Sequence, residues 1–378
     1  MKIAILGSRG IPSLYGGYER FTEALAPDLS RRGNDVFVSC EGTNEKNPLL
    51  IYKGVNIFYF PFLPPRSYTL RKFYEVVYDG YSLLKMSRDP NIEIIYMLGY
   101  GASIFFFIPM LFNKILVVNS DGIEWKRPKF NIIEKKLMLI CERLMVIFAD
   151  KIVADSDEIR KYFYNIYGLD VKFIPYGVSE IPTVIWEEAK LPSILMGNIR
   201  PNDYWLVAAR LEPENNIHTI VKAYIESNSK RPLIIVGDFS SLKYENLVNC
   251  LLADKLDVKK IIIVRNGYDG HSLNMLRQNC FAYIHGHSVG GTSPALLVPM
   301  IMKKLILIND NEFTREVCGN FGVYFSGTED LSKKINMVEE NPKNYSKLSD
   351  GVYKRARNNY SWEKILDKYD MLFHDLIR

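Results

Sequence analysis

The residues best placed to do chemistry stand in a glycine turn late in the chain. A strand is predicted at 281–284, and after it come Gly290 and Gly291, with Ser293 and Pro294 opening a helix. Serine is a favoured N-cap, and proline is tolerated in a first helical turn. Glycines admit a ligand close to the backbone, and the helix N-terminus behind them attracts anions, most often phosphate. The turn is therefore either a phosphate site or an ordinary strand-to-helix loop.

A second glycine pair, Gly16-Gly17, precedes a predicted helix near the start of the chain. It also suits close approach of a phosphate or a sugar at the open edge of a sheet. The turn before it, from Gly7 to Gly10, lacks the GxGxxG fingerprint of dinucleotide-binding domains, and no acidic residue marks the end of the second strand. This pattern argues against a hydride-transfer enzyme.

Apolar runs alternate with helical patterns along the chain, which argues for parallel βαβ units. The first series of predicted strands covers 2–6, 35–39, 55–60, 92–97, 115–119, 151–154 and 171–174. The second covers 205–208, 233–236, 260–264, 281–284, 305–308 and 323–325. The predicted fold class is α/β, with two Rossmann-like, doubly wound parallel-sheet domains. Ligands of such domains bind at the carboxyl ends of the strands, here in a cleft between the two domains.

The stretch 179–203 separates the two series of strands. It contains three prolines and Gly197 and shows little periodicity, so we place the linker there. The predicted domains are therefore 1–178 and 204–358. A length of 378 residues also favours two domains over one.

The composition indicates a cytoplasmic enzyme that does not bind nucleic acid. The chain is 48% hydrophobic, enough for two cores, and its five scattered cysteines have no zinc or disulfide spacing. The net charge of +5 is not concentrated in one segment, so no basic nucleic-acid face is predicted. The chain opens directly with a strand, so no signal peptide is expected. The apolar run 102–112 contains Pro109 and is too short to span a bilayer, which favours a buried or interfacial helix.

Two stretches, 66–88 and 126–143, mix cations with apolar and aromatic residues. The cations of the first are Arg66, Arg71, Lys72, Lys85 and Arg88. Those of the second include Lys126, Arg127, Lys129, Lys135 and Lys136. Each stretch is either an amphipathic basic surface that rests on an anionic membrane, or a helix with a solvated charged face. The first alternative predicts peripheral contact with the inner face of the plasma membrane.

The sequence Asp155-Ser156-Asp157 has the DxD pattern with which one class of sugar-nucleotide enzymes chelates a metal. It lies between the predicted strand 151–154 and a helix predicted at 158–167, and Ser156 is the natural N-cap. Acidic residues in the first turn are favoured by the helix dipole. We interpret the pattern as a cap. Since no other cluster of Asp, Glu and His has metal-ligand spacing, neither a metal nor another cofactor is predicted.

Several segments together resemble the family-4 glycosyltransferases, which have the GT-B fold. Gly16-Gly17-Tyr18-Glu19-Arg20 looks like the N-terminal signature of that family. Four segments resemble its bacterial rhamnosyltransferase branch, in which a domain first catalogued as uncharacterised precedes the catalytic half. They are 7–12, 121–127, 209–216 and 285–292. Residues 359–378 resemble the C-terminal helix with which such enzymes cross back to the first domain.

The resemblance implies transfer of a sugar, with retention, from a nucleotide-sugar on the C-terminal domain to an acceptor on the N-terminal one. Donors in the branch are typically dTDP-rhamnose, and acceptors are lipid-diphosphate-linked sugars destined for capsule or O-antigen. Cleavage leaves negative charge on the departing diphosphate, which fixed cations and backbone N–H groups must stabilise. Arg210 matches the family's diphosphate arginine, the alternative being a surface ion pair with Glu212 or Glu214.

Further site residues follow from the same match. Asn215 stands where most family members have a lysine, although an Asn-Asn pair is usual in the branch. His285 and His287 are candidates to hold the donor phosphate or sugar hydroxyls. The remaining donor-site candidates are Gly16, Gly17, Gly237, Asp238, Tyr268, Gly290, Gly291, Thr292 and Ser293.

The predicted catalytic residues are Asp121, Glu124, Arg210 and His287. Asp121 and Glu124 follow a strand of the first domain, where one of them would orient or deprotonate the acceptor hydroxyl. The alternative for Asp121 is that it only caps the following turn.

Two glutamates of the family are missing from the glycine turn. Gly290 replaces the first, as is usual in the branch. Val298 replaces the second, which usually holds the donor ribose, and Pro299 follows inside the predicted helix at a cost of roughly 3 kcal/mol unless tolerated locally. Three functions therefore stay open. We favour an active glycosyltransferase over a catalytically silent sugar-nucleotide-binding partner subunit, and the missing fingerprint disfavours a Rossmann-type oxidoreductase.

Overall fold

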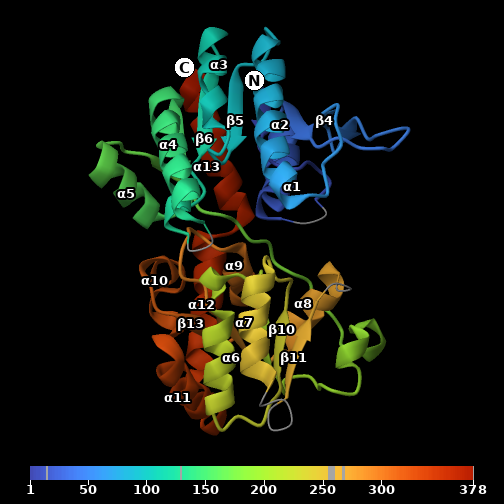
Figure 1. Ribbon diagram of the computed structural model, residues 1–378, viewed down its shortest axis with the longest axis vertical. Helices are drawn as coiled ribbons and strands as arrows, with labels where there is room; N and C mark the ends of the chain where they lie inside the picture. The colour runs from blue at the N-terminus through green and yellow to red at the C-terminus, as the bar shows by residue number, and fades with distance from the viewer. Residues whose placement is uncertain (14–15, 128–129, 254–259, 266–268, 378) are drawn as a thin grey trace. The chain divides into compact units, whose positions relative to one another are not determined.

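The computed structural model describes residues 1–13, 16–127, 130–253, 260–265 and 269–377, which form two α/β units (Figure 1). The first unit comprises the described residues of Met1–Lys126, Phe130–Gly177 and Trp362–Arg378. The second comprises those of Arg127–Lys129 and Val178–Ser361. Each unit is built on one largely parallel sheet, as the alternating pattern predicts.

The first unit has an eight-stranded sheet in the order β3-β4-β2-β1-β5-β6-β7-β8, and only the β3–β4 pair is antiparallel. The interior strands are almost wholly apolar, as is usual where helices cover a parallel sheet, and all five residues of β5 are buried. The strands are β1 Lys2–Leu6, β2 Asp35–Cys40, β3 Ile51–Tyr52, β4 Val55–Tyr59, β5 Ile94–Leu98, β6 Ile115–Asn119, β7 Lys151–Ala154 and β8 Lys172–Phe173.

Among the residues that the structure describes, six helices pack on this sheet, and the last of them comes from the C-terminal end of the chain. They are α1 Gly17–Arg31, α2 Tyr68–Arg88, α3 Phe107–Leu111, α4 Ile132–Phe148, α5 Asp157–Tyr167 and α13 Trp362–Ile377, with short 3-10 turns η1 Ser103–Phe105 and η2 Glu124–Lys126. The Tyr369 hydroxyl of α13 lies 3.0 Å from that of Tyr96 on β5. Arg32 beside α1 also bonds Asp367 at 2.8 Å. These contacts fix α13 to the first unit.

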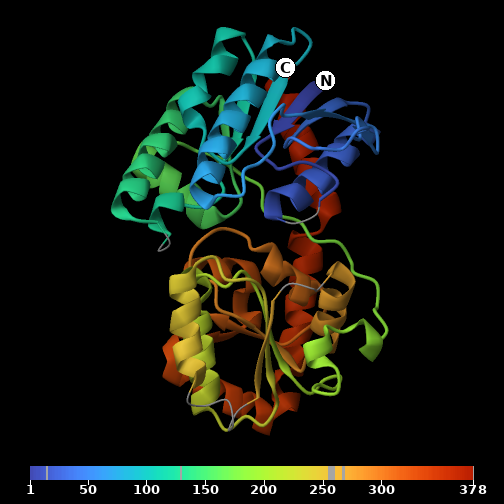
Figure 2. The same cartoon turned by 45° about the vertical axis from the view of Figure 1, so that its right-hand side comes forward.

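The second unit has a six-stranded sheet, parallel throughout, in the order β11-β10-β9-β12-β13-β14 (Figure 2). The strands are β9 Trp205–Ala208, β10 Leu233–Val236, β11 Ile261–Val264, β12 Ala282–His285, β13 Ile306–Asn309 and β14 Val323–Phe325. The helices are α6 Ile217–Glu226, α7 Leu242–Ala253, α8 Gly270–Asn279, α9 Pro294–Ile301, α10 Glu312–Cys318, α11 Gly327–Glu340 and α12 Ser346–Asn359. The described part of this unit also has the short 3-10 turns η3 Glu188–Lys190, η4 Ser193–Leu195, η5 Pro213–Asn215, η6 Gly319–Phe321 and η7 Pro342–Tyr345.

Two segments differ from the simplest expectation. Within 102–112 the chain forms η1 and the five-residue α3 in place of one helix, and Ile104 and Met110 are exposed. The stretch 179–203 packs on the second unit, because Val184 donates to Gln278 and the side chains of Leu191 and Leu195 are buried. Among the helices that the structure describes, none has both the length and the apolarity needed to cross a bilayer.

Candidate functional site

The order of strands in the second sheet reverses between β9 and β12. From β9 the chain continues to β10 and β11 on one side, and from β12 to β13 and β14 on the other. Ligands of such sheets bind where the order reverses, at the carboxyl ends of the strands. Arg210 stands two residues after the end of β9, and His287 stands two residues after the end of β12. The fold therefore brings these two predicted residues to the usual ligand position.

Asn215 ties the two loops together. Its Nδ2 donates to the carbonyl oxygen of Arg210 at 2.7 Å, and its Oδ1 lies 2.8 Å from Nδ1 of His287. Next to it, Asn216 donates to the carbonyl oxygen of Gly286 at 2.8 Å. A lysine at 215 has no acceptor atom and would leave the histidine nitrogen without this partner. The asparagine pair is thus a structural link between β9 and β12.

Glycines allow the loops to approach one another. A Cβ on Gly286 would collide with the carbonyl oxygen of Asn215. Gly237 has φ +153, and a Cβ there would collide with the carbonyl oxygen of Ala209. Beside Gly237, the carbonyl oxygen of Asp238 accepts from the Leu211 amide at 2.9 Å. Gly237 and Asp238, two predicted donor-site residues, therefore lie beside the Arg210 loop.

Both histidines are neutral at ordinary pH. Burial lowers the pKa of His285 to about 4, and its side chain is only 3% exposed. Burial, followed by the charge of His285, lowers the pKa of His287 to about 3. The two ring centroids lie 5.9 Å apart. His285 has almost no surface to offer a ligand, so His287 is the histidine that can contact one directly.

The hydrogen bonds fix which nitrogen of His287 carries the proton. Asn215 uses its Nδ2 as a donor toward Arg210, so its Oδ1 faces Nδ1 of the histidine and requires a proton there. A neutral imidazole with its proton on Nδ1 accepts a hydrogen bond at Nε2. The ring also has a hydrogen bond with the backbone of Val289, which opposes the lowering of its pKa. Both predicted roles for His287, contact with a sugar hydroxyl and contact with the donor phosphate, therefore stay open.

Two asparagines at the end of β13 belong to the same arrangement, although they were not among the predicted site residues: Asn309 is the last residue of the strand, and Asn311 follows it. Asn311 donates from Nδ2 to the carbonyl oxygen of His287 at 2.9 Å, and Asn309 donates to the same oxygen at 3.4 Å. The signal was present in the sequence, since polar residues follow the strand that pairs with β12. Their donors hold the His287 backbone in place.

Arg210 presents a cation at this point. Its side chain is 54% exposed, and Nη1 lies 3.7 Å from Oε1 of the buried Glu212. The predicted alternative of an ion pair with Glu212 is therefore observed, but at a distance too long for a direct hydrogen bond. The carboxylate orients the guanidinium, whose planar set of donors suits a diphosphate.

The glycine turn leads into α9 as predicted, with Pro294 in the first turn. Ser293 occupies the N-cap position, but its side chain makes no capping hydrogen bond, contrary to expectation. In the part of the chain that the structure describes, the amides of Gly290, Gly291 and Ser293 donate to no protein acceptor. Thr292 between them is buried. The turn thus keeps three N–H donors for an anion beside a helix N-terminus.

Pro299 lies inside α9, which nevertheless continues to Ile301. The amide of Met302 still donates to the carbonyl oxygen of Val298 at 3.1 Å. The helix therefore tolerates this proline locally. Val298 itself is partly exposed and offers no hydrogen-bonding group.

Asp121 and Glu124 lie in the first unit, just after β6. The amide of Asp121, which has φ +54, donates to Oδ1 of Asn119 at 2.8 Å. The amide of Glu124 donates to the Tyr100 hydroxyl at 3.1 Å. Burial and then the charge of Glu124 raise the pKa of Tyr100, which keeps this hydroxyl protonated. Both acidic residues are partly exposed on a fixed backbone, as a catalytic carboxylate requires.

The glycine pair at α1 has an acidic neighbour. Gly16 has φ +112, and a Cβ there would collide with the carboxylate of Glu19. That carboxylate also accepts from the Arg9 amide at 3.1 Å. Since like charges repel, a phosphate is disfavoured beside Gly16 and a neutral sugar suits it better. Gly17 is open, with no atom near the position of a Cβ.

The interpretation of Asp155-Ser156-Asp157 as a helix cap is confirmed. The Ser156 hydroxyl accepts from the Ile159 amide at 3.2 Å, and Asp157 pairs with Arg160 at 2.6 Å. Among the described residues, no group of three or more His, Cys, Asp and Glu side chains could hold a metal ion. Tyr268, a predicted donor-site residue, lies outside the described residues.

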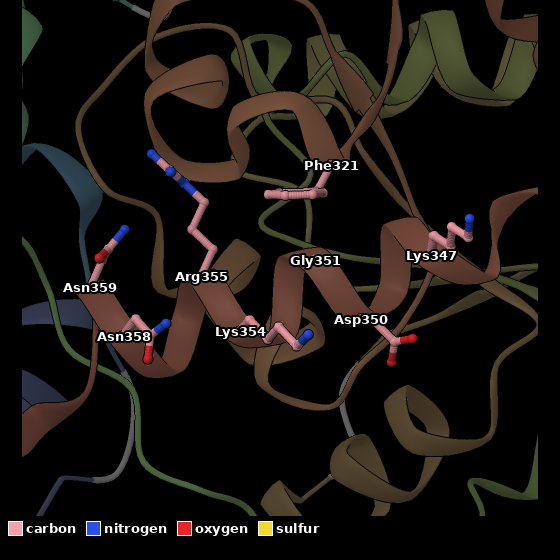
Figure 3. Close-up of a pocket in the computed structure, with 8 residues that line it drawn as sticks. All are labelled: Phe321, Lys347, Asp350, Gly351, Lys354, Arg355, Asn358 and Asn359. Atoms are coloured by element: carbon pink, nitrogen blue, oxygen red, sulfur yellow. The ribbon is translucent and has the colours of Figure 1, made fainter.

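A hollow of about 450 Å³ runs along α12 (Figure 3). Arg355 lines it but donates to the carbonyl oxygens of Val317 and Glu316, at 2.8 and 2.6 Å. Phe321 packs directly against Gly351. Because its arginine is already used to hold α10, we do not assign a ligand to this hollow.

Residues 1–179 match the family model described as a domain of unknown function, DUF1972. The prediction that the N-terminal part is a domain first catalogued as uncharacterised is therefore confirmed. Comparison with curated protein sequences finds no match.

Solved structures resemble the chain over nearly its whole length. Sucrose-phosphate synthase from Thermosynechococcus elongatus has a TM-score of 0.82 at 13% identity, with 100% of this chain and 99% of that chain covered. Anabaena Alr3699/HepE with UDP and glucose has a TM-score of 0.76 at 14% identity, with coverages of 99% and 100%. A glycosyltransferase from Rickettsia africae has a TM-score of 0.69 at 16% identity, with coverages of 100% and 98%. These likenesses establish the GT-B fold.

Proposed function

We propose that this protein is a glycosyltransferase that uses a nucleotide-sugar donor. The observation that carries the proposal is the pairing of Arg210 and His287 through Asn215, at the point where the second sheet reverses its strand order. The similar Anabaena HepE, solved with UDP and glucose, supports a nucleotide-sugar donor.

The site suits departure of a diphosphate without a metal. When the bond between sugar and phosphate breaks, negative charge grows on the diphosphate. The Arg210 guanidinium and the amides of Gly290, Gly291 and Ser293 would meet that charge. His287, which is neutral, would hold a hydroxyl of the transferred sugar. Removal of one such donor typically costs about 3–4 kcal/mol of transition-state stabilisation.

The finer assignment rests on the sequence resemblance. We propose that the donor is dTDP-rhamnose, transferred with retention, and that the acceptor is a lipid-diphosphate-linked glycan on the way to capsule or O-antigen polysaccharide. Asp121 or Glu124 would orient or deprotonate the acceptor hydroxyl. The reaction would take place in the cytoplasm, on the inner face of the plasma membrane.

A panel of nucleotide-sugars tests the proposal, with thermal shift and donor hydrolysis as readouts. One or more donors should raise the melting temperature and be hydrolysed slowly without acceptor. Arg210→Ala should remove both effects while the circular dichroism spectrum stays unchanged. Arg200→Ala, an exposed arginine of the same unit, is the matched control. Unchanged donor kinetics in folded Arg210→Ala would contradict the assignment.

A second candidate function is a catalytically silent subunit that binds a sugar-nucleotide. Val298 favours it, because this position lacks the carboxylate that holds the ribose in the family the sequence resembles. In this case the panel would give thermal shifts without hydrolysis or transfer.

A further inference from the structure

Helix α4 of the first unit buries a carboxylate and exposes a row of apolar side chains. Its buried positions are Cys141, Met145 and the charged Glu142, whose carboxylate accepts from the hydroxyls of Tyr162 and Tyr167 at 2.6 and 2.7 Å. Its outward positions are largely apolar. A soluble helix ordinarily buries its apolar side and exposes its charges. The outward side of α4 therefore suits a surrounding less polar than water.

The apolar surface extends beyond α4 onto its neighbours. Helix α3 contacts α2, the turn η1 contacts α4, and Lys72 of α2 bonds Glu134 of α4 at 2.6 Å. We call the exposed apolar residues of these elements the α2–α4 surface. They are Leu70, Phe73, Val77, Ile104, Phe107, Met110, Leu111, Phe112, Ile132, Ile133, Leu137, Ile140 and Ile147. Scattered exposed apolar residues are normal, but a set this large on adjacent elements marks an interaction site.

The exposed residues that carry charge on these elements are cations, because the acidic Glu75 of α2 is paired with Arg71 and Arg9 and Asp79 is partly buried. Among their described residues, the exposed charged ones are Lys85, Arg88, Lys136 and Arg143. Glu134 is paired with Lys72, and Glu142 is buried. An apolar surface with exposed cations matches an anionic lipid bilayer, where apolar side chains enter the interface and cations meet the headgroups.

A second copy of the chain is the main competing occupant. Ile133, Leu137, Ile140, Leu144 and Ile147 have the spacing of a coiled-coil seam. In a symmetric dimer, however, each residue near the axis faces its own copy, so Lys136 and Arg143 would meet like charges. The surface also continues over α3 and α2, well beyond one seam. The charges on this surface therefore favour an anionic membrane over a second copy of the chain as its partner.

We propose that the α2–α4 surface docks this protein on an anionic membrane, with the apolar side chains of α4 inserted at the lipid interface. The proposal deepens the proposed function, on which the lipid-linked acceptor rests, by naming the surface that reaches the lipid. Docking itself needs no donor chemistry, so it can be tested alone.

The test is co-sedimentation of the full chain with vesicles. One set is phosphatidylcholine, and the other is an equimolar mixture of phosphatidylcholine and phosphatidylglycerol. We expect binding to the anionic vesicles at least about tenfold tighter than to the neutral ones, weakening as salt is raised. Lys136→Glu with Arg143→Glu should remove this preference. Leu137→Asp with Ile140→Asp should lower binding at least about tenfold.

The matched control is Leu242→Asp with Leu247→Asp, two exposed leucines on α7 of the second unit. It should bind vesicles like the natural protein. Arg210→Ala should do so too, which separates failure of docking from failure of the donor site. Circular dichroism checks that each variant is folded.

Two results would overturn the proposal. The first is that the natural protein binds neither kind of vesicle, or that both test variants bind the anionic vesicles as tightly as the natural protein does. The other is a stable dimer, measured by light scattering, that Leu137→Asp with Ile140→Asp dissociates. That dimer would assign the surface to a second copy of the chain.

Discussion

Replacing Asn215 with alanine is the most direct test of the arrangement at the switch point. The side chain is 8% exposed and makes two hydrogen bonds, to the Arg210 carbonyl oxygen and to Nδ1 of His287. Loss of the first should cost about 1 kcal/mol, because the carbonyl of an exposed residue can be rehydrated. Loss of the second leaves an imidazole N–H without its acceptor, which should lower the free energy of unfolding by about 1–3 kcal/mol.

The sum, about 2–4 kcal/mol, should lower the melting temperature of the unit by roughly 4–16 °C. Part of the loss should also appear in donor affinity, because the same bonds hold the Arg210 and His287 loops together. We expect at least about a tenfold weaker dissociation constant, which corresponds to 1.4 kcal/mol. Differential scanning calorimetry measures the first effect, and titration calorimetry with the best donor measures the second.

Asn198→Ala is the control for this variant. Asn198 is exposed in the same unit and makes one side-chain hydrogen bond, to the carbonyl oxygen of Ile194 at 3.0 Å. Its removal should change stability by less than about 0.5 kcal/mol and leave donor affinity unchanged. If Asn215→Ala melts and binds donor like the natural protein, Asn215 does not link the two loops and the account of the site fails.

Three further predictions concern pH, metal and the donor base. The pKa of His287 is lowered to about 3, below the value of about 6.5 expected in the unfolded chain. The contribution of His287 to the free energy of unfolding is therefore fully present above pH ~6.5 and is lost as the pH falls toward 3. Urea unfolding across this range should show a shallower loss for His287→Gln than for the natural protein. EDTA should leave transfer nearly unchanged if Arg210 and the glycine-turn amides neutralise the diphosphate, whereas a strict Mg²⁺ requirement lost in Asp155→Ala would contradict this. If the donor ribose faces Val298, as the resemblance implies, the valine leaves a ribose hydroxyl without a partner, which costs about 1–3 kcal/mol of binding free energy. We therefore expect dTDP-sugars to bind better than UDP-sugars in titration calorimetry, and Val298→Glu to narrow that difference. A natural protein that prefers UDP- or GDP-sugars would refute this reasoning.

Much of the fold follows from apolar periodicity. Strands β1, β6, β7, β9, β10 and β14 have the predicted bounds, and the other predicted strands differ by one or two residues at one or both ends. The exception is β3, missed because two residues give no period. Glycine and proline signals likewise located the starts of α1 and α9.

Contacts between loops were beyond the sequence pattern. Arg210, Asn215 and His287 could be singled out one by one, but nothing in their spacing shows that one asparagine bonds both neighbours. The surface of α4 was undetermined for a similar reason. The stretch 126–143 contains the same charges whichever side of the helix faces outward. Only the burial of Glu142 in the structure shows which side of α4 faces the core.

His287 gives a common physical reason for two substitutions in the site. Asn215 stands where the resembling family usually has a lysine, and a lysine could not accept from Nδ1 of this histidine. Gly290 stands where the family usually has a glutamate. With φ +125, a Cβ at this position would come within 3.0 Å of Nε2, on the side where the ring accepts a hydrogen bond. Asn215 thus orients the ring, and Gly290 leaves space beside Nε2 that a side chain would fill. The two departures are parts of one arrangement built around a neutral histidine.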